Sequence, residues 1–134
     1  MSSESGGCQC GKIRFTVTGD PLWVAHCHCG DCRGATSSAF ATYAGFKKRN
    51  VTWEGDKPVG YESTPNTTRS FCPNCGTPLY YASGRWPEDI HLFVGAFDAP
   101  AGFNPQVHVF AGERLPWVHL GDGLPEFEKT PPGN

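Results

Sequence analysis

The sequence predicts an all-β fold. Short runs of alternating polar and apolar residues recur along the 134 residues, and no window keeps apolar residues at helical spacing. The 17 glycines and 12 prolines are spread along the chain, as is typical of turns between short strands. We expect one domain over residues 1–134, with an irregular tail over 121–134 that frays at its end.

Eight segments carry the strand signal. The clearest is Lys12–Thr18, which alternates polar and apolar residues and is ended by Gly19-Asp20-Pro21. Helical evidence is limited to a single turn within Asp31–Ser38. The other predicted strands are short apolar, aromatic or β-branched runs: Leu22–His26, Ala39–Phe46, Val51–Trp53, Thr67–Phe71, Pro78–Ala82, Ile90–Val94 and Gln106–Phe110.

The charge balance favours neither nucleic acid nor a membrane as a partner. The net charge is −2, and the basic run Lys47-Lys48-Arg49 is short enough to be a solvated turn. No stretch approaches the roughly 20 apolar residues of a membrane span. The first seven residues lack the basic and apolar regions of a secretory signal, so we expect a cytoplasmic protein. In such a reducing compartment, cysteines are metal ligands or reactive thiols rather than disulfides.

The seven cysteines form three groups with none left over. Cys8 and Cys10 form a C-x-C, and Cys72 and Cys75 form a C-x-x-C. Between these two pairs lies a C-x-C-x-x-C, made of Cys27, Cys29 and Cys32. Buried structural cysteines would not be expected to fall into such spacings, so metal binding is favoured. A redox dithiol at Cys29 and Cys32 is the weaker alternative, because the βαβ context of such dithiols is absent.

The segment Cys72-Pro73-Asn74-Cys75-Gly76 is the most specific local signal. It is a turn on which two thiolates can converge on one metal, and Gly76 can take the positive φ that such a turn needs. A tetrahedral Cys₄ site requires two more thiolates, which Cys8 and Cys10 can supply. The sequence therefore predicts a closed structural zinc site that joins the N-terminus to the middle of the chain.

The central group supplies only three sulfurs. Three protein ligands with one open position are typical of a zinc ion that takes part in chemistry. His26 or His28 could occupy the fourth position and close the site. In the alternative interpretation both histidines pack locally or support the ligands.

These motifs resemble the glutathione-dependent formaldehyde-activating enzyme family, which also includes the centromere protein V group. The resemblance covers about residues 6–127, with a looser C-terminal part from His108 through Pro116-Trp117-Val118. It rests on three motifs: Gly6-Gly7-Cys8-Gln9-Cys10-Gly11-Lys12-Ile13-Arg14-Phe15, Cys27-His28-Cys29-Gly30-Asp31-Cys32-Arg33, and Arg69-Ser70-Phe71-Cys72-Pro73-Asn74-Cys75-Gly76-Thr77-Pro78-Leu79.

The resemblance implies a β-tent fold of stacked short antiparallel sheets held by two zinc ions per chain. It assigns one zinc to the four outer cysteines and the second to the three central cysteines, which is the division that the coordination argument also gives. The outer cysteines are Cys8, Cys10, Cys72 and Cys75, and the central ones are Cys27, Cys29 and Cys32. It also implies condensation of formaldehyde with glutathione to S-(hydroxymethyl)glutathione, which is a carbon–sulfur lyase reaction in reverse. In that chemistry the cysteines are ligands and the sulfur of the substrate is the nucleophile.

Four further residues are candidates for the site. His28, the histidine nearest to the metal ligands in sequence, and His108 are the predicted acid–base residues, although either could be a structural histidine. Arg33 could hold a carboxylate of glutathione or form a surface ion pair. Trp117 could line a substrate pocket, although a core position is the more common one for tryptophan.

Two other classes of function compete with a thiol-dependent lyase. One is a non-enzymatic carrier of glutathione or another small thiol, which would use the same open site. The other is a structural zinc module that binds a protein partner, although no large apolar or strongly charged patch can be read from the sequence.

Overall fold

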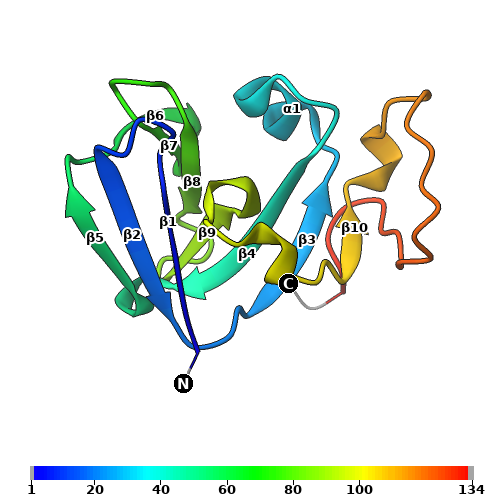
Figure 1. Ribbon diagram of the computed structural model, residues 1–134. Helices are drawn as coiled ribbons and strands as arrows, with labels where there is room; N and C mark the ends of the chain where they lie inside the picture. Colours follow the sequence, from blue (N-terminus) through cyan, green and yellow to red (C-terminus); the bar gives the residue numbers. More distant parts are fainter. Residues whose placement is uncertain (1, 133–134) are drawn as a thin grey trace.

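Strands dominate residues 2–132, which are the residues that the computed structural model describes (Figure 1). Within that range there is one α-helix, α1 (Gly30–Thr36), and there are four 3₁₀ turns, η1 (Lys48–Asn50), η2 (Val94–Ala96), η3 (Pro100–Gly102) and η4 (Ala111–Glu113). The all-β expectation is confirmed. The strands are β1 (Ser3–Gly7), β2 (Ile13–Thr18), β3 (Trp23–Cys27), β4 (Ala41–Lys47), β5 (Val51–Gly55), β6 (Val59–Thr64), β7 (Thr67–Phe71), β8 (Pro78–Ser83), β9 (Asp89–Phe93) and β10 (Val107–Val109).

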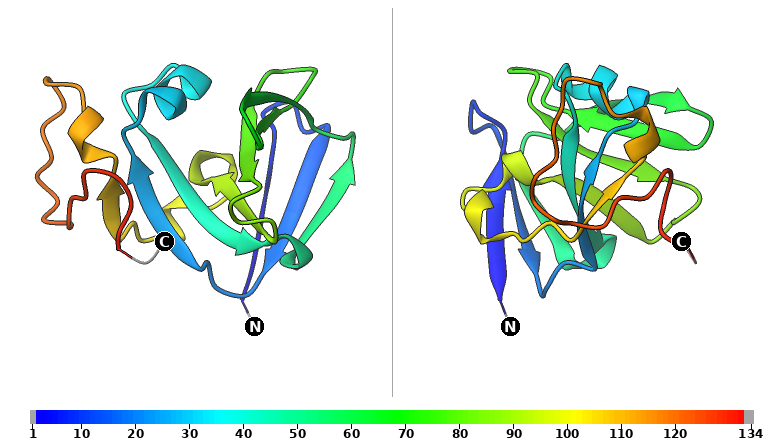
Figure 2. Two further views of the ribbon diagram at one scale, coloured as in Figure 1. Left: turned by 180° about the vertical axis from the view of Figure 1, so that it is seen from behind. Right: turned by 90° about the vertical axis from the view of Figure 1, so that its right-hand side faces the viewer.

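The strands form two sheets. The smaller has the order β1-β2-β5, and the larger has the order β10-β3-β4-β9-β8-β7-β6. Neighbouring strands are antiparallel except for β10 and β3, which are parallel. Figure 2 shows from two more sides that the small sheet is inclined to β3 and β4, while α1 lies at the far end of these strands from the N-terminus.

The main core lies between the two sheets. Strand β2 buries every second side chain, and these are Ile13, Phe15 and Val17. Phe15 packs edge-on against Phe97, with 5.1 Å between the ring centroids. A second, smaller cluster contains Tyr43 and Phe93 together with cysteines of the central group. The alternation that predicted the strands therefore also decides which side chains form the core.

All eight predicted strand segments are confirmed, but strands β1 and β6 were not predicted. Strand β1 has no apolar alternation, and it pairs through its backbone with β2. A Cβ on Gly6 would meet the backbone oxygen of Ala96 at 2.4 Å, so glycine is required by close packing. Strand β6 is almost fully exposed at the edge of the large sheet, where no burial selects an apolar pattern.

Helix α1 is longer than the single turn expected. Its N-cap is Cys29, whose Sγ accepts a hydrogen bond from the Cys32 N–H at 3.3 Å, and its C-cap is Ser37, which has a left-handed backbone. A cysteine of the central group thus serves as the helix cap. No helix within residues 2–132 is long and apolar enough to cross a membrane.

The described part of the tail, residues 121–132, is attached to the large sheet. The His108 N–H donates to the carbonyl of Pro125 at 2.9 Å, and the Phe127 N–H donates to the carbonyl of His108 at 2.9 Å. These bonds hold the tail along β10. The expected fraying concerns residues 133–134, which lie outside the described residues.

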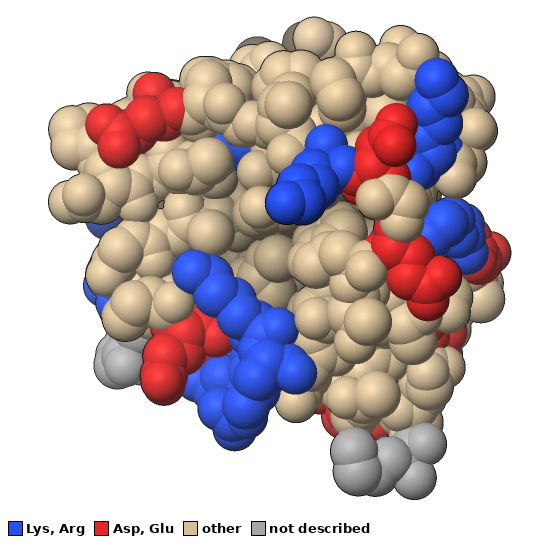
Figure 3. All heavy atoms as spheres, turned by 90° about the vertical axis from the view of Figure 1, so that its left-hand side faces the viewer, with Lys and Arg blue, Asp and Glu red and all other residues tan. Residues whose placement is uncertain are grey.

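Charges of opposite sign lie side by side on the face drawn in Figure 3. Lys47, at the end of β4, pairs with Asp89 of β9 at 2.7 Å, and Arg14 of β2 pairs with Asp98. The run Lys47-Lys48-Arg49 therefore starts with a residue whose charge is balanced by a neighbouring strand.

Candidate metal centres

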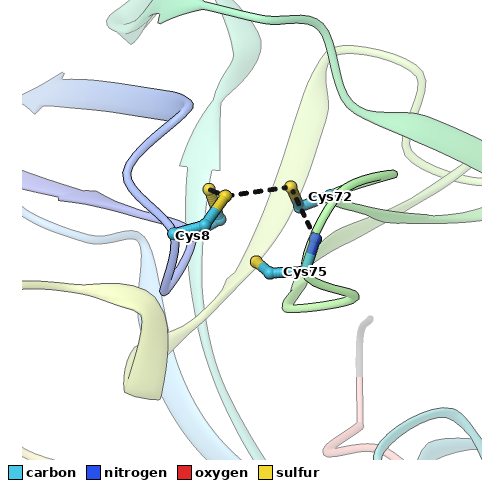
Figure 4. Close-up of side chains that lie close together, drawn as sticks. Cys8, Cys72 and Cys75 are labelled. Atoms are coloured by element: carbon cyan, nitrogen blue, oxygen red, sulfur yellow. Dashed lines mark hydrogen bonds between the residues drawn. The ribbon is translucent and has the colours of Figure 1, made fainter.

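The four outer cysteines meet between the two sheets (Figure 4). Their Sγ atoms all lie within 4.8 Å of one another, with 3.5 Å between Cys8 and Cys10 and 3.8 Å between Cys10 and Cys72. Sulfurs bound tetrahedrally at about 2.3 Å lie roughly 3.8 Å apart, so the cluster fits a zinc ion. Because Cys8 and Cys10 follow β1 and the other pair follows β7, such an ion would join the small sheet to the large one.

Local backbone structure prepares this cluster for thiolates. Gly11 and Gly76 take φ values of +80° and +82°, as the turns after each cysteine pair require. Backbone N–H groups point at two of the sulfurs: Ile13 donates to Cys8 Sγ at 3.3 Å, and Asn74 and Cys75 donate to Cys72 Sγ at 3.4 and 3.5 Å. Donors to sulfur favour the thiolate, which is the form that binds metal.

Cys75 shows the same preference. The Thr77 hydroxyl, 3.2 Å from Cys75 Sγ, and then the backbone N–H of Thr77 lower the pKa of this thiol to about 5. A hollow of about 650 Å³ adjoins the cluster, and Cys75 and the Arg14–Asp98 pair are among its walls. The four sulfurs leave no ligand position for a substrate on a tetrahedral ion, so this hollow is not where we expect the chemistry.

The central cysteines also converge. Cys27 ends β3, Cys29 caps α1, and Cys32 lies inside that helix. Their Sγ atoms lie within 4.8 Å of one another, at 3.5 Å from Cys27 to Cys29 and 3.3 Å from Cys32 to Cys27. The two cysteine clusters could therefore each hold a zinc ion, one with four sulfurs and the other with three.

Two buried side chains that the sequence did not single out contact the central cluster. The Tyr43 hydroxyl donates to Cys32 Sγ at 3.4 Å, and Arg69 Nη2 lies 3.8 Å from the same sulfur. Arg69 also donates from Nη1 to the Tyr43 hydroxyl at 3.1 Å, and its guanidinium lies 5.2 Å from the centre of the Tyr81 ring. The available sequence signal was the position of Arg69 in the middle of a predicted strand, because a charged side chain that becomes buried in a sheet requires a partner.

The electrostatics of this contact favour an anionic sulfur. Hydrogen bonding with Cys27 and then with Cys29 lowers the pKa of Cys32, and Tyr43 and Arg69 lower it further. Burial, followed by the charge of Cys32, raises the pKa of Tyr43, so its hydroxyl stays protonated and able to donate. Tyr43 and Arg69 thus stabilise one ligand sulfur as a thiolate.

The histidines belong to a different network. Strand β3 alternates its side chains, so His26 and Cys27 lie on opposite faces of the sheet. His28 Nε2 lies 2.9 Å from His108 Nδ1, and His108 Nε2 lies 2.8 Å from Asp122 Oδ2. Within residues 2–132, no histidine nitrogen lies within 4.8 Å of all three central sulfurs.

The predicted acid–base residues, His28 and His108, contact each other, and neither has a nitrogen within 4.8 Å of all three central sulfurs. His28 and His108 are both fully buried, and His28 Nδ1 has no hydrogen-bond partner among the described residues. Burial, followed by the nearby His108, lowers the pKa of His28 to about 4.

The two predicted substrate-binding residues lie in different surroundings. Arg33 Nη1 donates to the backbone carbonyls of His28 and Glu113, with 2.6 Å to the second of these. This guanidinium ties the loop at the cysteines to the segment after β10. Trp117 is 65% exposed, so the expectation of a core position for it is wrong. Among residues 2–132, the loop that carries Trp117 pairs with no strand that would bury the ring.

Comparison with known proteins gives concordant results. Residues 3–113 match the model of the glutathione-dependent formaldehyde-activating enzyme family. An uncharacterized lyase of Schizosaccharomyces pombe is 35% identical over 123 residues, which cover 84% of this chain and 89% of that protein. A crystal structure of a Rhodobacter sphaeroides protein has the same fold, with a TM-score of 0.60 at 21% identity, over 75% of this chain and 91% of that one. The chain therefore belongs to the glutathione-dependent formaldehyde-activating enzyme family and is a lyase of that family.

Proposed function

We propose that the protein is a zinc-dependent carbon–sulfur lyase that acts on the adduct of a small thiol, such as glutathione, with formaldehyde. One observation carries the proposal: Cys27, Cys29 and Cys32 bring three sulfurs together, while the neighbouring histidines bond elsewhere. A tetrahedral ion on these sulfurs would have one position left for an exogenous ligand.

The proposed reaction is simple to balance. In the forward direction a carbon–sulfur bond forms between the thiol and formaldehyde, and the thiol proton ends on the former carbonyl oxygen. In the lyase direction that bond breaks, formaldehyde leaves, and the hydroxyl proton returns to sulfur. A zinc ion bound at the central cluster would favour the thiolate form of the incoming thiol at neutral pH.

The residues around the cluster have separate proposed tasks. Tyr43 and Arg69 hold the charge of Cys32 through the contacts described above, which keeps this sulfur a ligand rather than a nucleophile. Arg33 follows Cys32 directly, and its remaining N–H groups could pair with a carboxylate of glutathione. The exposed ring of Trp117 offers an apolar surface against which a peptide-like thiol could pack.

His28 and His108 are the proposed proton carriers. The contacts of 2.9 Å between them and 2.8 Å from His108 to Asp122 form a hydrogen-bonded chain that leads to the surface. His28 follows one cysteine ligand and precedes another, so it is the member of the chain nearest to the sulfurs in sequence.

Exchange of labelled formaldehyde into glutathione tests the proposal. Free ¹³C-formaldehyde and its glutathione adduct give separate NMR resonances when their uncatalysed exchange is slow. Micromolar protein should accelerate the interconversion of these two species. The Cys29→Ser variant should lose this acceleration. His119 is exposed and lies outside the three-residue cluster, so His119→Gln should keep it. Glutathione binding without any acceleration would overturn the lyase and favour the thiol carrier.

A further inference from the structure

A row of polar side chains crosses the large sheet on the face opposite Cys27. Thr42 of β4 pairs directly with His26 of β3, and His26 pairs directly with His108 of β10. Directly paired residues project to the same face, so the three side chains are neighbours. The tail adds a fourth group, because Asp122 reaches His108 across 2.8 Å.

From this arrangement we propose that His26, His108 and Asp122 bind a divalent transition-metal ion, separate from the two cysteine clusters. One ligand atom of each residue lies within 4.8 Å of the other two. The two imidazole rings are stacked, with 4.8 Å between their centroids and 29° between their planes. Two imidazoles and one carboxylate are a known ligand set for Fe²⁺, Co²⁺ and Zn²⁺, with the remaining positions filled by water.

The contacts behind the rings support a site rather than an incidental ion pair. Thr42 Oγ1 lies 2.8 Å from His26 Nδ1, and His28 Nε2 lies 2.9 Å from His108 Nδ1. In each ring Nδ1 is thus held by a partner, and Nε2 is the nitrogen left to face a metal. Outer partners of this kind fix the tautomer and orientation of metal-binding histidines.

Asp122 gives the site both charge and access from solvent. Its side chain is 41% exposed, whereas that of His108 is 1% exposed. Oδ1 accepts the N–H of Leu124 at 3.1 Å, which leaves Oδ2 for the ligand position. An ion entering here would replace the proton shared by His108 and Asp122, would fasten the tail to β3 and β10, and would interrupt the proposed proton chain at His108 while it is bound.

Cobalt titration of the zinc-loaded protein tests the proposal without any measurement of turnover. A cobalt ion at the histidine site should add weak d–d absorption with no sulfur-to-cobalt charge-transfer band, because no thiolate is involved. It should also shift or broaden the imidazole resonances of His26 and His108 and raise the Tm, since a ligand that binds only the folded state stabilises it.

Three variants identify the ligands. Asp122→Asn and His26→Gln should not bind this additional cobalt ion at cobalt concentrations that saturate the unmodified protein. His119→Gln should bind it as the unmodified protein does. Thr42→Val removes only the partner of His26 and should weaken binding by about 10–100-fold. The proposal is overturned if all bound cobalt shows the sulfur charge-transfer band, or if both ligand variants still bind the additional cobalt ion.

Discussion

The Tyr43 hydroxyl donates to Sγ of Cys32 across 3.4 Å, and this contact connects the core of the large sheet to the proposed chemistry. Both residues are buried, Tyr43 on β4 and Cys32 inside α1. Arg69 extends the contact to β7 by donating to the tyrosine oxygen. The central cluster is therefore held by α1, by the next strand β4, and by β7, which lies far from both in sequence.

Tyr43→Phe should leave the fold intact and weaken the central site. Loss of the hydroxyl removes one donor to Cys32 Sγ and one acceptor for Arg69, and loss of such outer contacts typically costs about 10–100-fold in metal affinity or activity. Competition with a zinc chelator measures the affinity. Tyr81→Phe is the matched control, because the Tyr81 ring packs on Tyr43 with centroids 4.8 Å apart. Equal losses in both variants would contradict the assigned role.

The two cysteine clusters should hold two zinc ions per chain, since the cysteines divide into a group of four and a group of three, and an ion at the histidine site would be in addition to these. Elemental analysis of protein purified without chelators gives the total. Cys27→Ser should lower the zinc content by one ion per chain. An unmodified protein that carries no zinc would refute the assignment of both clusters.

Cys75→Ser should destabilise the whole protein more than Cys32→Ser. The outer cluster joins the two sheets, so a lost ligand there removes folding free energy. Each kcal/mol lost lowers the Tm by roughly 4 °C at this size, and we expect Cys75→Ser to melt at least about 10 °C below the unmodified protein. Cys32→Ser should melt much closer to it. Thermal melts that show equal damage would mean that the two roles are wrongly assigned.

His91 should make stability fall in mild acid. It is buried against the rings of Trp23 and Tyr81, and burial lowers its pKa to about 4. Below about pH 6.5 the unfolded chain takes up a proton that the folded protein takes up only near pH 4, so stability is lost as the pH falls through this window, by up to about 1.4 kcal/mol per pH unit.

Denaturant unfolding of His91→Phe at several pH values measures this contribution. The variant should show a shallower loss of stability between pH 6.5 and 4 than the unmodified protein. Acid release of zinc affects both proteins alike, so the difference between their slopes isolates His91. Identical slopes would show that His91 does not carry this dependence.

Sequence patterns predicted the parts of the fold that burial enforces. Strand β2 was readable because Ile13, Phe15 and Val17 alternate, whereas β1 is held by backbone pairing alone and has no such pattern. Cysteine spacing predicted both clusters, since a short turn brings its own ligands together. The contact of Arg69 with Cys32 spans 37 residues and depends on strand order, which no local pattern encodes.

The same limit explains His26. Its nearness to Cys27 in sequence made it a possible fourth metal ligand, but a one-residue step along β3 places its side chain on the opposite face of the sheet. The pairing of His26 with Thr42 and with His108 followed from the sheet order and not from any motif.

The central claim is that the zinc ion at Cys27, Cys29 and Cys32 has an open position that takes an exogenous thiol. X-ray absorption at the zinc edge, on protein loaded at both cysteine clusters, measures the mean number of sulfur ligands with and without saturating glutathione. The account predicts a rise of half a sulfur per zinc on average, because one of two sites goes from three sulfurs to four at about 2.3 Å. An unchanged sulfur count at saturating glutathione would contradict it.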